Sequence, residues 1–318
     1  MKKFTKILAL VSAIMIAIFA FTGCMGAKKL KLATGGSSGT YYAYGNALAT
    51  LVTNNNDFKV SAVTSGASAA NILQISNKQA DLAIVQNDVA YYAYTGTDLF
   101  ATQGKQENIR IIGYMYSEVC QIVAREGINS IEDLRGKRVS VGDAGSGVEF
   151  NAKQILGAYG ITFNDIQKQN LSFGDSADAI KDDTLDAFFC TAGAPTTAIV
   201  ELATTKNINL LSVDQDHIDI LQENYDFYKP YTVPAGTYNG VDTDTLMVTV
   251  KATLIADKDV SEDKIYNIVK ALFAKDHTAS YAKFEELKVA DFFDACEEST
   301  VPFHAGALKF YNEIMDQR

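Results

Sequence analysis

The chain has 318 residues, 47% of them hydrophobic, and its 38 Asp and Glu residues outnumber 28 Lys and Arg residues to give a formal net charge of −10. This length accommodates two domains with cores of their own, and the hydrophobic fraction excludes a disordered chain. The acidic balance argues against a nucleic-acid partner, and 4 Cys and 3 His residues leave little material for a disulfide scaffold, a metal site or histidine-based catalysis. We therefore expect no metal and no cofactor.

A basic start and an uncharged run open the sequence. Three lysines within residues 1–6 precede the uncharged residues 7–27, which is the pattern of a secretory signal. The run contains Phe21-Thr22-Gly23-Cys24, which resembles the lipobox of bacterial lipoproteins. We expect residues 1–23 to be a cleaved signal peptide and residues 24–29 a tether that is lipidated at Cys24. The alternative is an uncleaved membrane anchor, because the run is nearly long enough to span a bilayer. In both cases the rest of the protein lies outside the cytoplasm, anchored to the cell membrane.

Removing residues 1–23 leaves 25 basic and 38 acidic residues, a formal charge of −13. The cysteines that remain besides Cys24 are Cys120, Cys190 and Cys296, an odd number. They are either buried free thiols or include one pair, Cys120 with Cys190.

One unit recurs along the rest of the chain: a short apolar strand, a tight run of small residues and a helix. We expect strands of this unit at residues 30–33, 58–63, 82–85, 138–141 and 187–190. After the fourth strand, apolar residues recur on one helix face from Val148 to Tyr159, and Pro195 suits the first turn of the helix after the fifth strand. Strands that alternate with helices at this spacing predict an α/β fold with parallel-dominated sheets built of βαβ units.

Small and polar residues follow each of these five strands. In open α/β sheets, ligands bind outside the carboxyl ends of the strands, where such loops gather. Glycine allows the backbone to approach a ligand closely, and the free N–H groups and dipole of a helix N-terminus favour an anion. Each loop by itself also fits an ordinary βα turn with a capping residue. Five together predict a shared ligand cleft.

Catalytic motifs are absent or incomplete. Thr34 stands where a dinucleotide-binding loop needs its first glycine. Ser146 lies in a segment similar to the nucleophile loop of serine proteases, but no histidine can be assigned as its base. We therefore expect a binding protein and not an enzyme.

Seven segments follow one another along the chain: ATGGSSGTYY (33–42), TSGASAAN (64–71), VQND (85–88), DLRGKRV (133–139), GDAGSG (142–147), DAFFCTAGAP (186–195) and PFHAGA (302–307). Together these segments resemble the TAXI family, the solute receptors of TRAP transporters. The resemblance covers essentially the whole chain after the leader. It implies a monomeric extracytoplasmic receptor that captures a small carboxylate, either a glutamate-like amino acid or a dicarboxylate. The receptor would deliver this ligand to a membrane permease driven by an ion gradient.

The resemblance also implies a two-lobed fold of the periplasmic-binding-protein type (type II-like), with the ligand cleft between the lobes. The first lobe would comprise residues 30–116 plus 245–318, and the second lobe residues 117–244. The extended segments 109–116 and 246–250 would cross between the lobes, which close over the ligand by a hinge motion.

The cleft loops contain no Arg or Lys, so we expect the backbone N–H groups of Gly145, Ser146, Gly147 and Val148 to hold the ligand carboxylate, with hydroxyls of Ser146 and Ser65 assisting. Tyr41 would cover an apolar stem and donate its hydroxyl. Asp88 and Glu118 could hold an ammonium; the alternatives are a helix cap for Asp88 and a solvated acid for Glu118. The complete predicted site is Gly39, Thr40, Tyr41, Ser65, Gly66, Gln86, Asn87, Asp88, Glu118, Gly145, Ser146, Gly147, Val148, Ala192 and Gly193.

Two other classes of function remain open from the sequence. One is a receptor of the same fold that signals to a membrane sensor. The other is an extracellular enzyme on a related fold, which would need a nucleophile–base pair that the sequence does not show.

Overall fold

The structure is a computed structural model, and it describes residues 29–274, 278, 281–288 and 299–316. The predicted signal peptide, the lipobox with Cys24, and Cys296 lie outside these residues. Within the described ranges, no helix combines the length and the apolar character that a membrane crossing requires.

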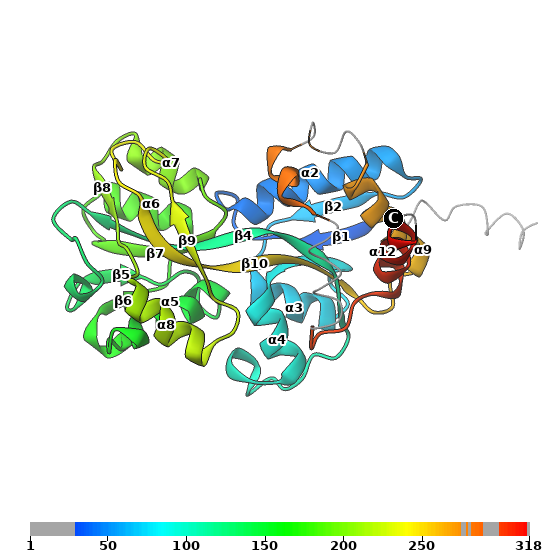
Figure 1. The fold of residues 1–318 in the computed structure, drawn as a ribbon, viewed down its shortest axis with the longest axis horizontal. Coiled ribbons are helices and arrows are strands. Elements are labelled where there is room, and N and C mark those ends of the chain that lie inside the picture. Colours follow the sequence, from blue (N-terminus) through cyan, green and yellow to red (C-terminus); the bar gives the residue numbers. More distant parts are fainter. Residues whose placement is uncertain (1–28, 275–277, 279–280, 289–298, 317–318) are drawn as a thin grey trace, which may run out of the picture.

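Two α/β lobes lie side by side and are joined by two long strands, β4 (Ile109–Arg125) and β10 (Thr245–Asp257) (Figure 1). The right-hand lobe in the figure contains β1 (Leu30–Ala33), β2 (Val60–Val63), β3 (Leu82–Gln86), α2 (Thr40–Asn55), α3 (Ser68–Ser76), α4 (Asn87–Thr95), α9 (Glu262–Leu272) and α12 (Ala305–Met315). The left-hand lobe contains β5 (Arg138–Ser140), β6 (Gln167–Gln169), β7 (Ala187–Ala192), β8 (Ile208–Leu210), β9 (Lys229–Val233), α5 (Gly147–Ala158), α6 (Phe173–Lys181), α7 (Thr197–Ala203) and α8 (Gln215–Asn224).

The strands form one mixed sheet whose main order is β2-β1-β3-β10-β4-β7-β5-β6. Within each lobe the βαβ strands are parallel: β1 pairs with β2 and β3, and β5 pairs with β6 and β7. The crossing strands β4 and β10 run antiparallel to each other and to their neighbours β7 and β3. The predicted dominance of parallel pairing therefore holds inside each lobe but not for the crossing strands, which the βαβ pattern did not include.

Each side of the molecule has its own hydrophobic core. Buried residues up to Tyr116 and from Ala252 onward pack in one cluster, whereas those from Val119 to Val250 pack in two others. The boundaries between these clusters lie where β4 and β10 pass from one lobe to the other. Separate cores connected by a few strands are what a hinge motion between lobes requires.

The five predicted strands are present, but the prediction for Pro195 is wrong. Thr196 caps helix α7 with an extended backbone (φ −102°, ψ 133°), and the helix begins at Thr197, so Pro195 precedes the first turn instead of lying in it. The cause is tertiary: the backbone N–H of Thr196 donates to the hydroxyl of Tyr238 at 2.9 Å, which holds this residue outside the helix.

Cys120 and Cys190 are free and buried. On the paired strands β4 and β7, Cys120 lies opposite Thr191, and Gln121 lies opposite Cys190. Because side chains alternate between the two faces of a sheet, the two sulfur atoms point to opposite faces and pack in different cores.

Candidate functional site

The loops that follow β1, β2, β3, β5 and β7 meet at the junction of the two lobes, where they enclose a cavity of about 40 Å³. A volume of this size holds a few water molecules. We call it the interlobe cavity. It is lined by Gly35, Gly36, Ser38, Gly39, Thr40, Tyr41, Ala67, Ser68, Gln86, Glu118, Asp143, Ser146, Gly147, Val148, Ser172, Phe173, Thr191 and Ala192.

The structure brings nine of the predicted site residues to this cavity. They are Gly39, Thr40, Tyr41, Gln86, Glu118, Ser146, Gly147, Val148 and Ala192. Gly193 is adjacent, because its carbonyl oxygen accepts a hydrogen bond of 3.2 Å from the Thr40 hydroxyl. This contact joins the two lobes across the cavity, so the structure represents a closed arrangement.

Five predicted residues do not line the interlobe cavity: Ser65, Gly66, Asn87, Asp88 and Gly145. The Ser65 hydroxyl is used inside its own loop, within hydrogen-bond distance of the Thr34 carbonyl (3.0 Å) and Asn71 Oδ1 (2.5 Å). Asn87 faces elsewhere, since its Oδ1 accepts the backbone N–H of Lys251 at 2.9 Å. The expected ligand contacts of these side chains are therefore replaced by contacts within the protein.

The N–H of Gly145 is also occupied, by a carboxylate of the protein itself. It donates to Oε2 of Glu149 at 2.6 Å, and Lys168 forms an ion pair with the same side chain. Although burial opposes it, these hydrogen bonds lower the pKa of Glu149. The N–H of Ser146 donates to the Asp143 carbonyl at 3.0 Å. Of the four backbone donors predicted here, those of Gly147 and Val148 remain without an acceptor among the described residues.

Two helix N-termini, one from each lobe, border the interlobe cavity. Helix α2 begins at Thr40 after Gly39, which has no side chain to cap it, and α5 begins at Gly147 after Ser146, whose hydroxyl accepts the Glu149 N–H at 3.2 Å. The first N–H groups of a helix lack partners inside the helix, and its dipole places partial positive charge there. The two helices together can hold an anion such as a carboxylate.

Glu118, from the crossing strand β4, supplies an acidic side chain at the same cavity. Its side chain is 1% exposed, and Oε2 accepts a hydrogen bond of 2.6 Å from the Tyr41 hydroxyl. Burial raises the pKa of the Glu118 carboxyl well above its usual range. The Tyr41 hydroxyl therefore donates to Glu118 and not to a ligand as expected from the sequence. In the described part of the chain, Glu118 forms no ion pair.

Gln86 adds a second acceptor at the interlobe cavity. Its Nε2 donates to Asn151 Oδ1 of the other lobe at 3.0 Å, whereas its buried Oε1 has no hydrogen-bond partner among the residues described. A buried acceptor without a donor costs free energy. Gln86 Oε1 and Glu118 together create a place that suits a donor group from a ligand.

Asp88 lies behind the cavity in a polar network that connects the lobes. Its Oδ1 accepts the Val89 N–H at 2.8 Å and its Oδ2 accepts Asn151 Nδ2 at 3.1 Å, so both oxygens are occupied by the protein. Burial raises the pKa of Asp88 to about 6, although both hydrogen bonds oppose this. The side chain is a structural acceptor between α4 and α5 in this arrangement.

Sequence reasoning missed a basic side chain near the cavity. Lys283, in the short helix Ala282–Glu286, donates from Nζ to the Ala194 carbonyl of the other lobe at 3.1 Å. Its charge partly offsets the rise in the Glu118 pKa that burial causes. Since Lys283 is distant in sequence from every cleft loop, no local motif could have identified it.

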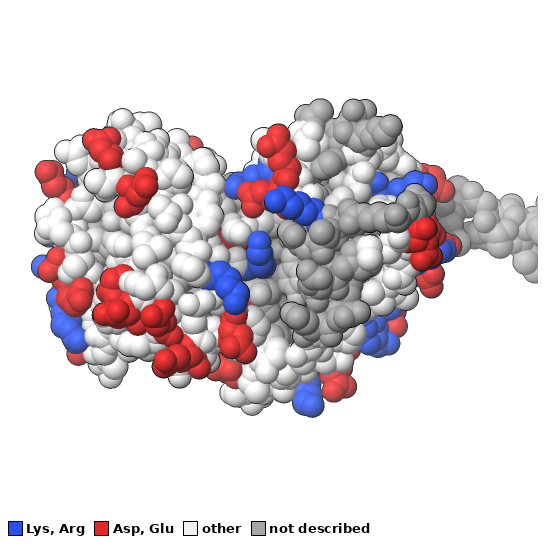
Figure 2. Space-filling model, in the orientation of Figure 1, with Lys and Arg blue, Asp and Glu red and all other residues white. Residues whose placement is uncertain are grey.

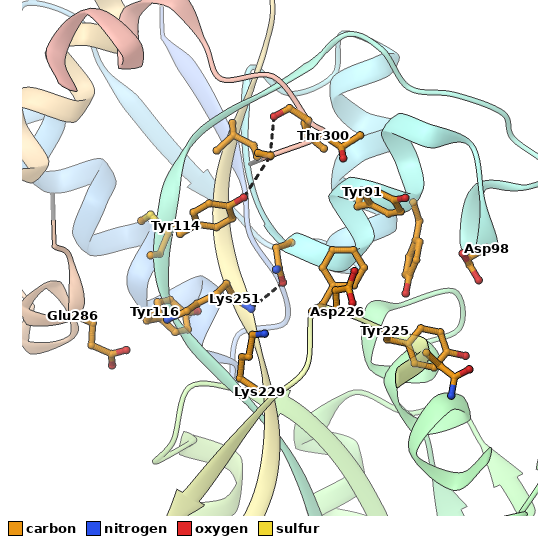
Figure 3. Close-up of a pocket in the computed structure, with 18 residues that line it drawn as sticks. Tyr91, Asp98, Tyr114, Tyr116, Tyr225, Asp226, Lys229, Lys251, Glu286 and Thr300 are labelled. Atoms are coloured by element: carbon orange, nitrogen blue, oxygen red, sulfur yellow. Dashed lines mark hydrogen bonds between the residues drawn. The ribbon is translucent and has the colours of Figure 1, made fainter. Parts of the chain in front are cut away.

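A larger groove of about 860 Å³ also lies at the junction of the lobes (Figure 3). Tyr91, Tyr114 and Tyr225 form part of its walls, and Lys229 and Lys251 lie at one end. Asn87 is the one predicted site residue that lines it. The interlobe cavity, where nine predicted residues meet, is therefore the better candidate for the ligand site.

Acidic side chains predominate in the lobe of residues 117–244, and this excess affects how the cavity can bind an anion. Residues 117–244 carry 20 Asp and Glu against 9 Lys and Arg, and acidic side chains are frequent on the left-hand lobe (Figure 2). The long-range field of this lobe therefore repels anions, and a carboxylate must be captured by the local N–H groups. Across the described ranges, no group of three or more His, Cys, Asp or Glu side chains could hold a metal ion.

Comparisons with known proteins agree with this geometry at the level of the fold. The NMT1-like family matches residues 32–314. A solved protein from Bordetella bronchiseptica RB50 is 13% identical, with 89% of this chain and 88% of that chain covered and a TM-score of 0.52. An ancestral arginine-binding protein bound to arginine is 15% identical, with 82% and 96% covered and a TM-score of 0.50. The alkanesulfonate-binding protein SsuA from Xanthomonas axonopodis pv. citri, bound to MOPS, is 14% identical, with 91% of both chains covered and a TM-score of 0.47. The chain belongs to the NMT1-like family and has the two-lobed α/β periplasmic-binding-protein fold.

Proposed function

We propose that this protein is an extracytoplasmic solute receptor that captures a small amino acid between its two lobes, which would lie farther apart around the ligand than they do around the cavity of about 40 Å³ in this structure. The observation that supports this most directly is the interlobe cavity, where the N-termini of α2 and α5 border the buried carboxyl of Glu118. Such a cavity offers backbone donors for a carboxylate and a side-chain acceptor for an ammonium.

The same chemistry separates an amino acid from a dicarboxylate. An ionised carboxyl is costly to bury without a partner, and a ligand ammonium near Glu118 and Gln86 Oε1 would supply one. A dicarboxylate would bring a second negative charge toward Glu118 instead. Of the two ligand classes that the sequence suggests, we therefore favour the amino acid.

Closure would proceed through the crossing strands. We propose lobes of residues 30–116 plus 245–318 and of residues 117–244, which rotate about β4 and β10. A ligand shifts this equilibrium by its extra affinity for the closed arrangement. The direct contacts between lobes, such as Thr40 with Gly193 and Lys283 with Ala194, would form only when the lobes close.

The partners follow from the resemblance to the TAXI family. We propose that the protein is monomeric, that lipid on Cys24 anchors it to the cell membrane, and that it delivers its ligand to a TRAP-type permease driven by an ion gradient. Replacing Cys24 with Ser is expected to release the protein from the membrane fraction. Unchanged attachment of this variant would contradict lipidation.

A thermal-shift panel of L-amino acids and dicarboxylates tests the ligand class. A ligand that binds only the native state raises the free energy of unfolding by about 2.7 kcal/mol at a hundredfold excess over its Kd. We expect a clear rise in the unfolding midpoint with at least one amino acid. No rise with any member of the panel would refute the proposed ligand class.

A further inference from the structure

We propose that Gly147 is the positioning residue that allows the two lobes to close, because any side chain at this position would hold them apart. The inference rests on the proposed function only in that closure serves ligand capture. The claim itself concerns the geometry between the lobes and does not depend on the identity of the ligand.

Gly147 lies directly against the other lobe. A Cβ atom added to it would overlap Oε1 of Gln86, and it would lie 2.6 Å from Cδ of Gln86 and 3.0 Å from Cγ2 of Val89. Gln86 ends β3 and Val89 is in α4, whereas Gly147 begins α5. Carbon atoms in van der Waals contact lie about 3.5–4.0 Å apart. A Cβ at position 147 therefore does not fit the closed arrangement unless the end of the Gln86 side chain or the lobes themselves move.

The backbone at this position does not require glycine. Gly147 is the first residue of a helix, whereas Gly142 (φ 86°) and Gly145 (φ 73°) in the preceding loop adopt the left-handed conformation that favours glycine. Any residue can take the conformation of Gly147, so the requirement comes from the space between the lobes.

Burial and hydrogen bonding restrict the atoms that a new side chain would meet. Gln86 is 2% exposed, and its amide is held by the hydrogen bond of Nε2 to Asn151 Oδ1. Val89, which is part of α4, is fully buried in the hydrophobic core of its lobe. A larger residue at position 147 is thus accommodated most easily by separating the lobes.

A disulfide across the cleft can trap the closed arrangement. A Cβ added to Gly174 of α6 would lie 3.9 Å from Cβ of Ser38 in the other lobe. The Cβ atoms of natural disulfides are about 3.8 Å apart, so Ser38→Cys with Gly174→Cys should cross-link when the lobes close. Cys24→Ser and Cys296→Ser remove the other candidate thiols, while Cys120 and Cys190 are buried.

The test compares the rate of this cross-link in the full chain with and without a change at Gly147. We expect Gly147→Leu to slow cross-linking by at least about tenfold, the scale that overpacking produces, and Gly147→Ala to slow it less. Gly157→Leu is the matched control: it lies on the exposed side of the same helix, and a Cβ there meets no atom within 4 Å. This control should cross-link at the parent rate.

Far-UV circular dichroism and the unfolding midpoint show whether each variant is folded, so that slow cross-linking is not mistaken for misfolding. If Gly147→Leu does not fold, the cross-linking rate of Gly147→Ala is compared with that of the parent instead. Equal rates in the Gly147 variants and the parent would overturn the proposal. A parent that never cross-links would overturn it too, because the lobes would then not reach this arrangement. Failure of every amino acid to accelerate cross-linking in the parent would count against the proposed function and leave the role of Gly147 standing.

Discussion

The hydroxyl of Tyr41 donates a hydrogen bond of 2.6 Å to Oε2 of Glu118. This contact connects the first turn of α2, which offers unpaired N–H groups, with the crossing strand β4, which carries the buried carboxyl. A helix N-terminus and a buried carboxyl are thereby fixed next to each other at one cavity. Under the proposed function, a zwitterion would complement both, because its ammonium favours the ionised form of Glu118.

Glu118→Gln tests the acidic element. Hydrogen bonds to charged groups contribute about 1.5–3 kcal/mol, so we expect the affinity for an amino acid to fall about tenfold to a hundredfold. The free energy of unfolding without ligand should not fall at pH 7, because the variant no longer buries an ionisable carboxyl. Calorimetric titration and chemical denaturation measure the two effects. The exposed Glu126→Gln is the control, and equal affinity in both variants would exclude Glu118 from recognition.

Asp88 makes stability depend on pH. Its pKa is raised from 3.8 to about 6, so the native state binds this proton more tightly than the unfolded state does. The stabilisation is complete below the unfolded pKa and is lost as the pH rises through about 6. Relative to Asp88→Asn, which cannot titrate here, the parent should lose about 3 kcal/mol of unfolding free energy between acidic and neutral pH. Parallel pH profiles of the two proteins would contradict this assignment.

Asn151 is the centre of the buried network between the lobes. It accepts hydrogen bonds from Gln86 and Thr191, both at 3.0 Å, and donates to Asp88 at 3.1 Å and Tyr228 at 2.9 Å. Asn151→Ala leaves these buried groups without a partner, and each unsatisfied group costs about 1–3 kcal/mol. We expect the free energy of unfolding to fall by about 2–4 kcal/mol, as measured by chemical denaturation.

Asn224→Ala is the control for this change. Asn224 is exposed at the end of α8, and among the described residues its side chain donates a hydrogen bond only to the Ile220 carbonyl of the same helix. Its replacement should change the free energy of unfolding by less than about 0.5 kcal/mol. A loss in Asn151→Ala no larger than in this control would show that the network does not stabilise the closed arrangement.

Ser146 caps the helix that borders the cavity. Its hydroxyl accepts the Glu149 N–H at 3.2 Å, and Ser146→Ala is expected to cost about 1 kcal/mol of unfolding free energy. Ser261→Ala is a matched control, since Ser261 stands at the same position before α9 without a side-chain capping bond. Thermal unfolding of the two variants should differ accordingly, and equal losses would argue against the capping role of Ser146.

The sequence predicted the βαβ strands and the cavity loops because both have local signals. Alternation of apolar and polar residues marks β1, a continuous apolar run marks β3, and small or polar residues follow each strand end. Whether Gln86 or Asn87 faces the cavity depends on where β3 gives way to α4, which no local pattern specifies. The capping-box pattern, a serine followed three residues later by Glu, predicts a contact of Glu149 with the N–H of Ser146, whereas Glu149 accepts the N–H of Gly145 instead.

Contacts between residues that are distant in the sequence could not be predicted. Lys283 reaches the cleft from a helix that is distant in sequence. Glu118 lies at the cavity because β4 passes between the lobes there. The position of Thr196 outside α7 likewise depends on Tyr238, which is remote in sequence. Local residue patterns contain no information on such pairings.

The most direct test of the central claim is calorimetric titration of the purified protein with L-glutamate and other L-amino acids, each paired with the acid that lacks the amino group. If the interlobe cavity recognises a zwitterion through Glu118, at least one amino acid binds at a single site, and its deaminated counterpart binds at least about tenfold more weakly. Equal affinity of the two members of each pair, or no binding by any amino acid, would contradict the account.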